Sequence, residues 1–188
     1  WDVDLLSMSA HKCDGPKGSG ARFVRRQPLV HVAAQMHGGG HERGMRSGTL
    51  PTHQLVGMGK AAALVKEQQH ADEERVRALR DRLENALLAL GGVHVNGHRQ
   101  QRVANHMNLS FDGVDGEILL ASMARVAVSS GSACTSASVE PSYVLKAIGR
   151  SDALAHAGLR FSLGRFTTPE EVDFAITEVT RILSGLRR

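Results

Sequence analysis

A cysteine lies in the middle of a run of small residues at 129–138, which reads SSGSACTSAS. Small neighbours leave the thiol of Cys134 sterically open, and an accessible thiol can ionise and attack an electrophile. A structural cysteine in a tight turn would give a similar pattern. Buried cysteines seldom lie among so many serines, but both interpretations stay open at this point.

A lysine stands directly after an apolar segment. Ser9, Ala10, His11 and Lys12 close that segment, and a turn-rich stretch with three glycines follows at 14–20. A lysine that is removed from water loses its proton more readily, and the neutral amine can then form an imine with a carbonyl cofactor. A surface lysine at the start of a turn is the alternative interpretation.

An arginine alternates with apolar residues at 159–163, which read LRFSL. The planar guanidinium group of Arg160 suits a carboxylate that is held by two hydrogen bonds. A strand face that points to solvent would show the same alternation. Both interpretations are therefore kept.

Two histidines stand four residues apart in the glycine-rich stretch at 35–51, QMHGGGHERGMRSGTLP. The three consecutive glycines between His37 and His41 disfavour a helix that would bring the imidazoles together, and no cluster of other ligand types is nearby. We therefore expect no metal site here. A connection of this length is typical of a functional loop or an interface.

Hydrophobic periodicity predicts the elements that must hold these residues. Strands are expected at 2–9, 20–24, 93–96, 106–111, 126–129 and 158–163, and helices at 52–90, 115–125 and 141–149. In the long helix, one apolar face is formed by Val76, Leu79, Leu83 and Leu87. A final helix begins at residues 168–171, where Thr-Pro-Glu-Glu forms a capping box with proline at the first helical position.

Composition limits the possible classes of protein. The chain has 188 residues, of which 41% are hydrophobic and 22% charged, as in an ordinary globular protein of one large domain or slightly more. It has no apolar run long enough to span a membrane and no readable signal peptide. The net charge is +4, and the sequence shows no motif that is typical of nucleic-acid binding. We expect no membrane binding, no direct nucleic-acid binding and reduced thiols at both cysteines.

Four segments together resemble the cysteine desulfurases of the NifS/IscS type. Residues 9–18 are similar to that family's cofactor-lysine segment, and residues 35–51 to its central loop. The run at 129–138 resembles its catalytic cysteine loop, and RFSLGRFTT at 160–168 resembles its substrate-arginine strand. The motifs occur in the family's order over essentially the whole chain, which makes the combination far more specific than any single motif.

The resemblance implies an α/β protein with the PLP-dependent transferase fold type I, which is aspartate-aminotransferase-like. Residues 1–50 would form the end of the large PLP-binding domain and the central loop, and residues 51–188 the small α+β domain. Such enzymes are homodimers that use pyridoxal 5'-phosphate to remove sulfur from L-cysteine, which leaves L-alanine and an enzyme persulfide. The sulfur would go to iron–sulfur scaffold proteins, to tRNA thiolation and to other acceptors, in the cytoplasm or, in a eukaryote, the mitochondrial matrix.

The resemblance also implies residue roles. The cofactor would be bound by Lys12, Ser9, His11 and Thr49, the last reaching over from the other subunit. Lys12 would carry the imine bond and then move protons, with His11 as a further catalytic group. Arg160 would bind the substrate carboxylate, and Cys134 would attack the substrate sulfur. No resident metal is implied, although Cys134 would transiently contact an iron–sulfur cluster.

The chain departs from this family in three respects. It matches only about the C-terminal half, so we expect a piece of a longer enzyme and little or no desulfurase activity from these residues alone. Cys13 and Asp14 stand where an apolar residue and an aromatic residue or histidine are common. A carboxylate facing Lys12 would keep the amine protonated and hinder the cofactor link. The chain also stops at Arg188, without the C-terminal extension of longer members.

Two other functions stay open. A half-length, non-catalytic protein would accept sulfur on Cys134 and pair with a desulfurase or an acceptor. A selenocysteine lyase would differ from a desulfurase only by small changes in the substrate pocket. An aminotransferase is disfavoured by the long run of small residues around Cys134.

Overall fold

The computed structural model describes residues 2–130 and 141–187. The chain divides into two compact units, Trp1–Gln69 and His70–Arg188, and the division falls inside the longest helix, α1 (Thr52–Leu88). The predicted domain boundary between residues 50 and 51 stays a prediction, because a division by compactness does not define the domains of a longer enzyme.

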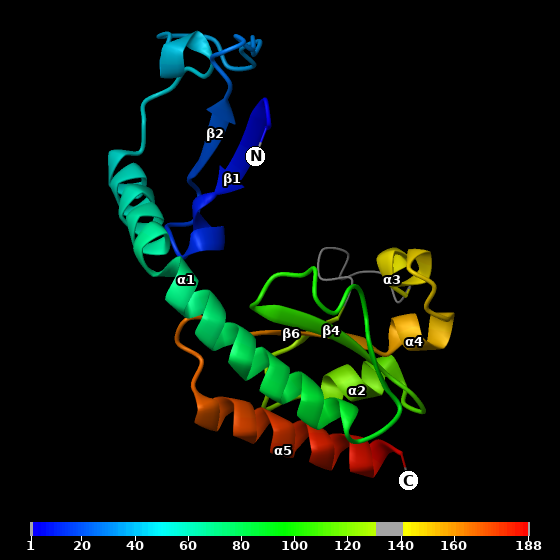
Figure 1. Ribbon diagram of the computed structural model, residues 1–188. Coiled ribbons are helices and arrows are strands. Elements are labelled where there is room, and N and C mark those ends of the chain that lie inside the picture. Colours follow the sequence, from blue (N-terminus) through cyan, green and yellow to red (C-terminus); the bar gives the residue numbers. More distant parts are fainter. Residues whose placement is uncertain (1, 131–140, 188) are drawn as a thin grey trace. The chain divides into compact units, whose positions relative to one another are not determined.

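The first unit contains an antiparallel strand pair. Strand β1 (Leu5–Ser9) pairs with β2 (Gly20–Val24), and Ser9 lies opposite Gly20 (Figure 1). Two short 3₁₀ helices, η1 (Ala10–Cys13) and η2 (Glu42–Gly44), and the first half of α1 complete the unit. Both predicted strands are confirmed, although the first begins at Leu5. Among the described residues of this unit, few are buried, namely Ala10, Ser47 and Ala61.

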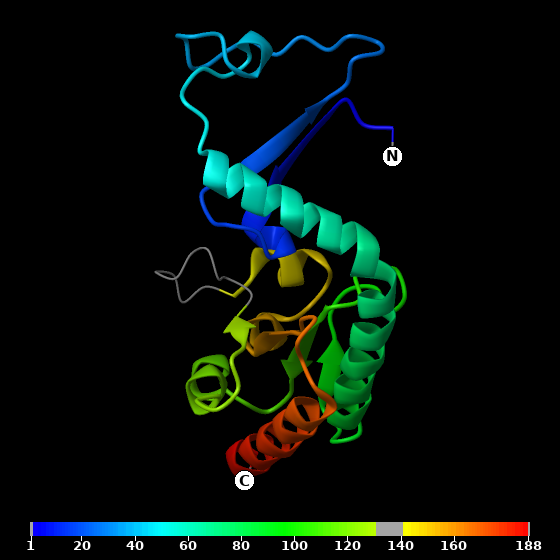
Figure 2. The ribbon, with the colours of Figure 1, turned by 90° about the vertical axis from the view of Figure 1, so that its left-hand side faces the viewer.

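The second unit is built on a four-stranded antiparallel sheet in the order β3–β4–β6–β5. The strands are β3 (Val93–Val95), β4 (His106–Phe111), β5 (Ser129–Ser130) and β6 (Gly158–Ser162). The helices are the second half of α1, α2 (Gly116–Ser122), α3 (Tyr143–Ala147), α4 (Asp152–His156) and α5 (Pro169–Leu186). Figure 2 shows α5 and the end of α1 next to the sheet.

The core of this unit lies on one face of the sheet. Side chains of a strand alternate between its two faces, so β4 buries Met107, Leu109 and Phe111, which contact the buried Leu159 and Phe161 of β6 in one cluster. The predicted apolar face of α1 joins this cluster, as do apolar residues of α5. The opposite face of the sheet is left to polar residues.

Two helix boundaries show how local chemistry defines the elements. The predicted capping box of α5 is confirmed, because the amide of Glu171 donates to Thr168 Oγ1 at 3.2 Å and the amide of Thr168 donates to Glu171 Oε2 at 3.0 Å. The helix predicted at 141–149 ends earlier, since Gly149 adopts a left-handed φ of 89°. A separate short helix, α4, then begins after the side-chain cap of Ser151, which the sequence analysis did not predict.

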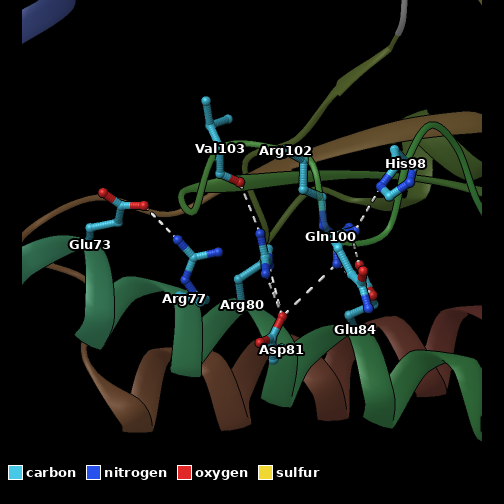
Figure 3. A network of polar contacts seen from close by, with 9 residues as sticks. All are labelled: Glu73, Arg77, Arg80, Asp81, Glu84, His98, Gln100, Arg102 and Val103. Carbon is cyan, nitrogen blue, oxygen red and sulfur yellow. Dashed lines mark hydrogen bonds and ion pairs between the residues drawn. The ribbon is translucent and has the colours of Figure 1, made fainter.

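A buried ion pair fastens the loop at 96–105 onto α1 (Figure 3). Arg102 donates two hydrogen bonds to Glu84, at 2.6 and 2.8 Å, and Glu84 is only 5% exposed. The hydrogen bond to Glu84 raises the pKa of the Arg102 guanidinium group, against the opposing effect of its burial. Nearby, Arg80 donates to the carbonyl of Val103 at 2.9 Å and pairs with Asp81 at 2.6 Å. The loop is thus held by Arg80, Glu84 and Arg102, whose charged side chains are largely buried, while Asp81 stays half-exposed.

We predict that Glu84→Gln lowers the free energy of unfolding by about 2 kcal/mol, because it leaves the charge of Arg102 without its buried partner. The matched control is Glu73→Gln, which removes the half-exposed pair with Arg77 on the same helix and should cost at most about 0.5 kcal/mol. Urea unfolding of both variants measures the difference. Equal losses would contradict the role assigned to the Glu84–Arg102 pair.

Candidate functional site

Lys12 lies in a tight turn that closes on one carbonyl group. The oxygen of Ala10 accepts hydrogen bonds from the amides of Asp14 and Gly15, the latter at 2.9 Å, and from Cys13 Sγ at 3.1 Å. The amide of Ala10 in turn donates to the carbonyl of Ser19 at 3.0 Å, at the end of β2. Ala10 is fully buried. The turn therefore fixes the backbone on both sides of Lys12.

The same turn is attached to the beginning of α1. Gln54 donates through Nε2 to the carbonyl of Lys17 at 2.9 Å. Pro16 lies so close to Gly57 that a Cβ atom on Gly57 would be 2.7 Å from Pro16 Cγ. A glycine at this position of α1 thus allows the turn to lie directly against the helix.

The turn exposes three neighbouring functional groups. Ser9, the last residue of β1, and His11 and Lys12 of η1 are all exposed. A hydroxyl, an imidazole and a primary amine thus lie on one short exposed segment, and their predicted role in cofactor binding stays a prediction. Asp14 ends the turn in the left-handed conformation, with φ of 61°, and its predicted effect on Lys12 stays a prediction.

The loop that carries Thr49 is closed by hydrogen bonds within itself. The amide of Gly48 donates to His41 Nδ1 at 3.3 Å, and the amide of Gly40 donates to the buried hydroxyl of Ser47 at 3.1 Å. The His41 nitrogen is thereby occupied as an acceptor. Thr49 is exposed beside this closure, between η2 and α1.

Arg160 lies on the polar face of the second unit's sheet. Its Nη2 donates to Ser129 Oγ at a long 3.4 Å, and no carboxylate of the described residues forms an ion pair with it. Burial lowers the pKa of His106 on β4, and the positive charges of Arg160, Arg80 and Arg102 lower it further. Arg80 and Arg102 are paired with Asp81 and Glu84, whereas the exposed side chain of Arg160 is open to an anionic ligand.

The predicted site residues fall into separate parts of the chain. Ser9, His11, Lys12 and Thr49 belong to the first unit and Arg160 to the second, while Cys134 lies outside the described residues. Sequence reasoning missed a hydrogen-bonded group beside Arg160, formed by Asn96, Asn108 and Arg150. Only the strand register places these residues together, so no local pattern in the sequence could have found them.

The ranges 2–130 and 141–187 contain neither a cluster of metal ligands nor a helix that could span a membrane. No group of three His, Cys, Asp or Glu residues there is arranged to hold a metal ion. No helix in that part of the chain is long and apolar enough to cross a membrane.

Comparisons with known proteins connect the chain to one family. Residues 1–174 match the model of the family described as aminotransferase class-V. The chain is 58% identical over 185 residues to the cysteine desulfurase IscS of Methylobacillus flagellatus, and equally to that of Aeromonas hydrophila, with 98% of the chain covered. The chain spans about half of these relatives, 46% of their length.

Solved structures of NifS-like proteins and cysteine desulfurases are also similar to the chain. The structure of a NifS-like protein matches with a TM-score of 0.84 and 33% sequence identity. The match covers 98% of this chain and 47% of the NifS-like protein. The structure of the cysteine desulfurase CsdA from Escherichia coli, in its S-sulfonic acid form, matches with a TM-score of 0.72. The match covers 98% of this chain and 47% of CsdA. At 20% identity, the second likeness shows the fold alone.

We predict that two glycines of α1 respond in opposite ways to alanine. Gly59 has open space where a Cβ would be, so Gly59→Ala should raise the free energy of unfolding by up to about 1 kcal/mol. Gly57→Ala should give no such gain and should speed amide hydrogen exchange at residues 14–19, because its methyl group displaces Pro16. Urea unfolding and hydrogen exchange measure both effects. Equal stabilisation by the two variants would show that the turn does not depend on its contact with α1.

Proposed function

The chain belongs to the class-V aminotransferase family, and we propose that it is the C-terminal half of a cysteine desulfurase. The likeness to the NifS-like structure confirms the predicted fold, the α/β PLP-dependent transferase fold type I. The 58% identity to enzymes named cysteine desulfurase IscS, over nearly the whole chain, is the observation that carries the proposal.

The proposed reaction converts L-cysteine and an enzyme thiol into L-alanine and an enzyme persulfide. The thiolate of Cys134 attacks the sulfur of the bound substrate, so that a sulfur–sulfur bond forms and the substrate's carbon–sulfur bond breaks. The bonding electrons stay with the carbon, which takes up a proton and ends as the methyl group of alanine. The substrate carbon is thus reduced, and the transferred sulfur is oxidised to the persulfide level. An accessible nucleophile among small residues suits this role.

The turn around Lys12 fits pyridoxal 5'-phosphate by the chemistry of its exposed groups. The amine of Lys12 would link to the aldehyde, and Ser9 and His11, which flank it, offer hydrogen-bond donors for the phosphate. Thr49 would add a hydroxyl from the partner subunit. When bound, the cofactor supplies the electron sink for chemistry at the substrate's Cα. Lys12 would hold and return the Cα proton, and Arg160 would orient the substrate through its carboxylate.

The partners of the full enzyme are part of the same proposal. We infer a homodimer in the cytoplasm that passes sulfur from Cys134 to iron–sulfur scaffold proteins, to tRNA thiolation and to other acceptors. The support is the high identity to bacterial proteins named IscS. A selenocysteine lyase-like preference is distinguished from this by comparing L-cysteine and L-selenocysteine as substrates.

One observation favours a second candidate function. The run of small residues around Cys134 leaves its thiol sterically open, which also suits a protein that accepts sulfur on Cys134 without cofactor chemistry of its own. An immunoblot of the source organism with an antibody against residues 168–188 separates the candidates. A band about twice the mass of this chain supports the desulfurase, and a band at about the mass of this chain, 20.2 kDa, supports the acceptor.

We predict that Cys134→Ala in the full-length, cofactor-loaded protein abolishes persulfide formation and leaves the absorption spectrum of the bound cofactor unchanged. The other cysteine provides the matched control, because Cys13→Ala should retain the persulfide. Mass spectrometry detects the persulfide as one added sulfur atom after incubation with L-cysteine. A persulfide that persists in Cys134→Ala and is lost in Cys13→Ala would reverse the assignment.

A further inference from the structure

A row of polar residues crosses the sheet of the second unit on the face opposite the core. Asn108 of β4 and Ser129 of β5 both lie directly opposite Arg160 of β6. Asn96, just after β3, continues the row, because its backbone N–H donates to the backbone carbonyl of Asn108 at 2.9 Å. Residues directly opposite one another in a sheet have their side chains on the same face and within reach.

Arg150 determines how the side-chain amide of Asn96 is oriented. A guanidinium group can only donate, and Arg150 Nε donates to Asn96 Oδ1 at 2.6 Å while its Nη2 donates to the carbonyl of Val95 at 2.6 Å. The oxygen of the Asn96 amide is thereby occupied. Its nitrogen must point the other way, and it donates to Asn108 Oδ1 at 2.6 Å and to Ser110 Oγ at 2.8 Å.

Two residues that offer hydrogen-bond donors therefore lie opposite one another in the middle of the row. The oxygen of the Asn108 side chain is taken by Asn96, so its NH₂ group is left to serve as a donor and has no acceptor among the described residues. Across the strand pair stands Arg160, which also can only donate and whose hydroxyl partner, Ser129, is 3.4 Å away. Arg160 is exposed and Asn108 is partly exposed, so water can reach both donors, and a ligand with two oxygen acceptors could take the place of that water.

We propose that the NH₂ group of Asn108 is a second hydrogen-bond donor to the substrate carboxylate, beside Arg160, with Arg150 and Asn96 as the positioning residues that turn it toward that carboxylate. This inference rests on the proposed function, which assigns the carboxylate to Arg160. A neutral amide adds a hydrogen bond without adding charge. It selects for a ligand with an oxygen acceptor beside the guanidinium group, as in an α-amino acid.

Asn108→Asp is the sharpest test in the full-length, cofactor-loaded protein. Aspartate has the same shape and still accepts the bond from Asn96, but it replaces the NH₂ group by an anionic oxygen. We expect the KM for L-cysteine and the dissociation constant of propanoate to rise at least tenfold, with little change in kcat. Propanoate binding is measured by ligand-observed NMR, which needs no turnover. The affinity for propanamide, which has no charge, should not fall.

The positioning residues are tested by Arg150→Met. Without Arg150, the side-chain amide of Asn96 can exchange the positions of its oxygen and nitrogen, and the Asn108 side chain is then no longer held with its NH₂ group toward the carboxylate. The dissociation constant of propanoate should therefore rise about threefold. Combined with Asn108→Leu, which alone should weaken propanoate binding about tenfold, Arg150→Met should add nothing, because residues that act through one another are not additive. Arg99→Met and Asn85→Leu, exposed residues elsewhere in the same unit, are the matched controls and should leave the affinity unchanged.

The outcomes separate the two proposals. Unchanged propanoate affinity in both Asn108 variants of an active enzyme overturns the inference and leaves the desulfurase standing. Full additivity of Arg150→Met and Asn108→Leu overturns the positioning roles. A wild-type protein that binds propanoate through Asn108 but releases no alanine from L-cysteine supports the anion site and overturns the proposed function.

Discussion

The two-residue period of β4 and β6 is the constraint on which the second unit depends. Alternate residues of these strands, such as Leu109 and Phe161, are buried against α1 and α5, and shifting the register by one residue would expose them all. The same register places Asn108 opposite Arg160 on the other face. The apolar core therefore determines which polar side chains stand beside one another, and the proposed substrate site is a consequence of how the hydrophobic face is buried.

The first unit holds its functional residues by a different principle. It has few fully buried side chains among its described residues, and the order around Lys12 comes from hydrogen bonds that converge on the carbonyl of Ala10. Contacts of Gln54 and Gly57 with the turn then tie this segment to α1. A site built on backbone hydrogen bonds needs less core than a site built on a sheet, which suits a segment that is proposed to present one amine and two donors.

Signals that are local in the sequence were readable, and signals that depend on pairing were not. The capping box of Thr168 and Glu171 is a four-residue pattern, and it predicted the start of α5 correctly. The residues Ser9, His11 and Lys12 are neighbours in the chain and so were predicted together. By contrast, the contact of Arg150 with Asn96 joins residues 54 positions apart, and the pairing of Asn108 with Arg160 requires the strand register. Whether Cys134 meets these groups lies beyond the described residues.

The most direct test of the account is to locate the cofactor on the chain. Borohydride makes an imine bond permanent, so the full-length protein is loaded with pyridoxal 5'-phosphate, reduced, digested and mapped by mass spectrometry. The account predicts that the label lies on the peptide containing Lys12 and disappears in Lys12→Ala. A label on Lys17, which lies in the same turn, or on any other lysine would contradict the site, and the absence of a label would contradict the proposed chemistry.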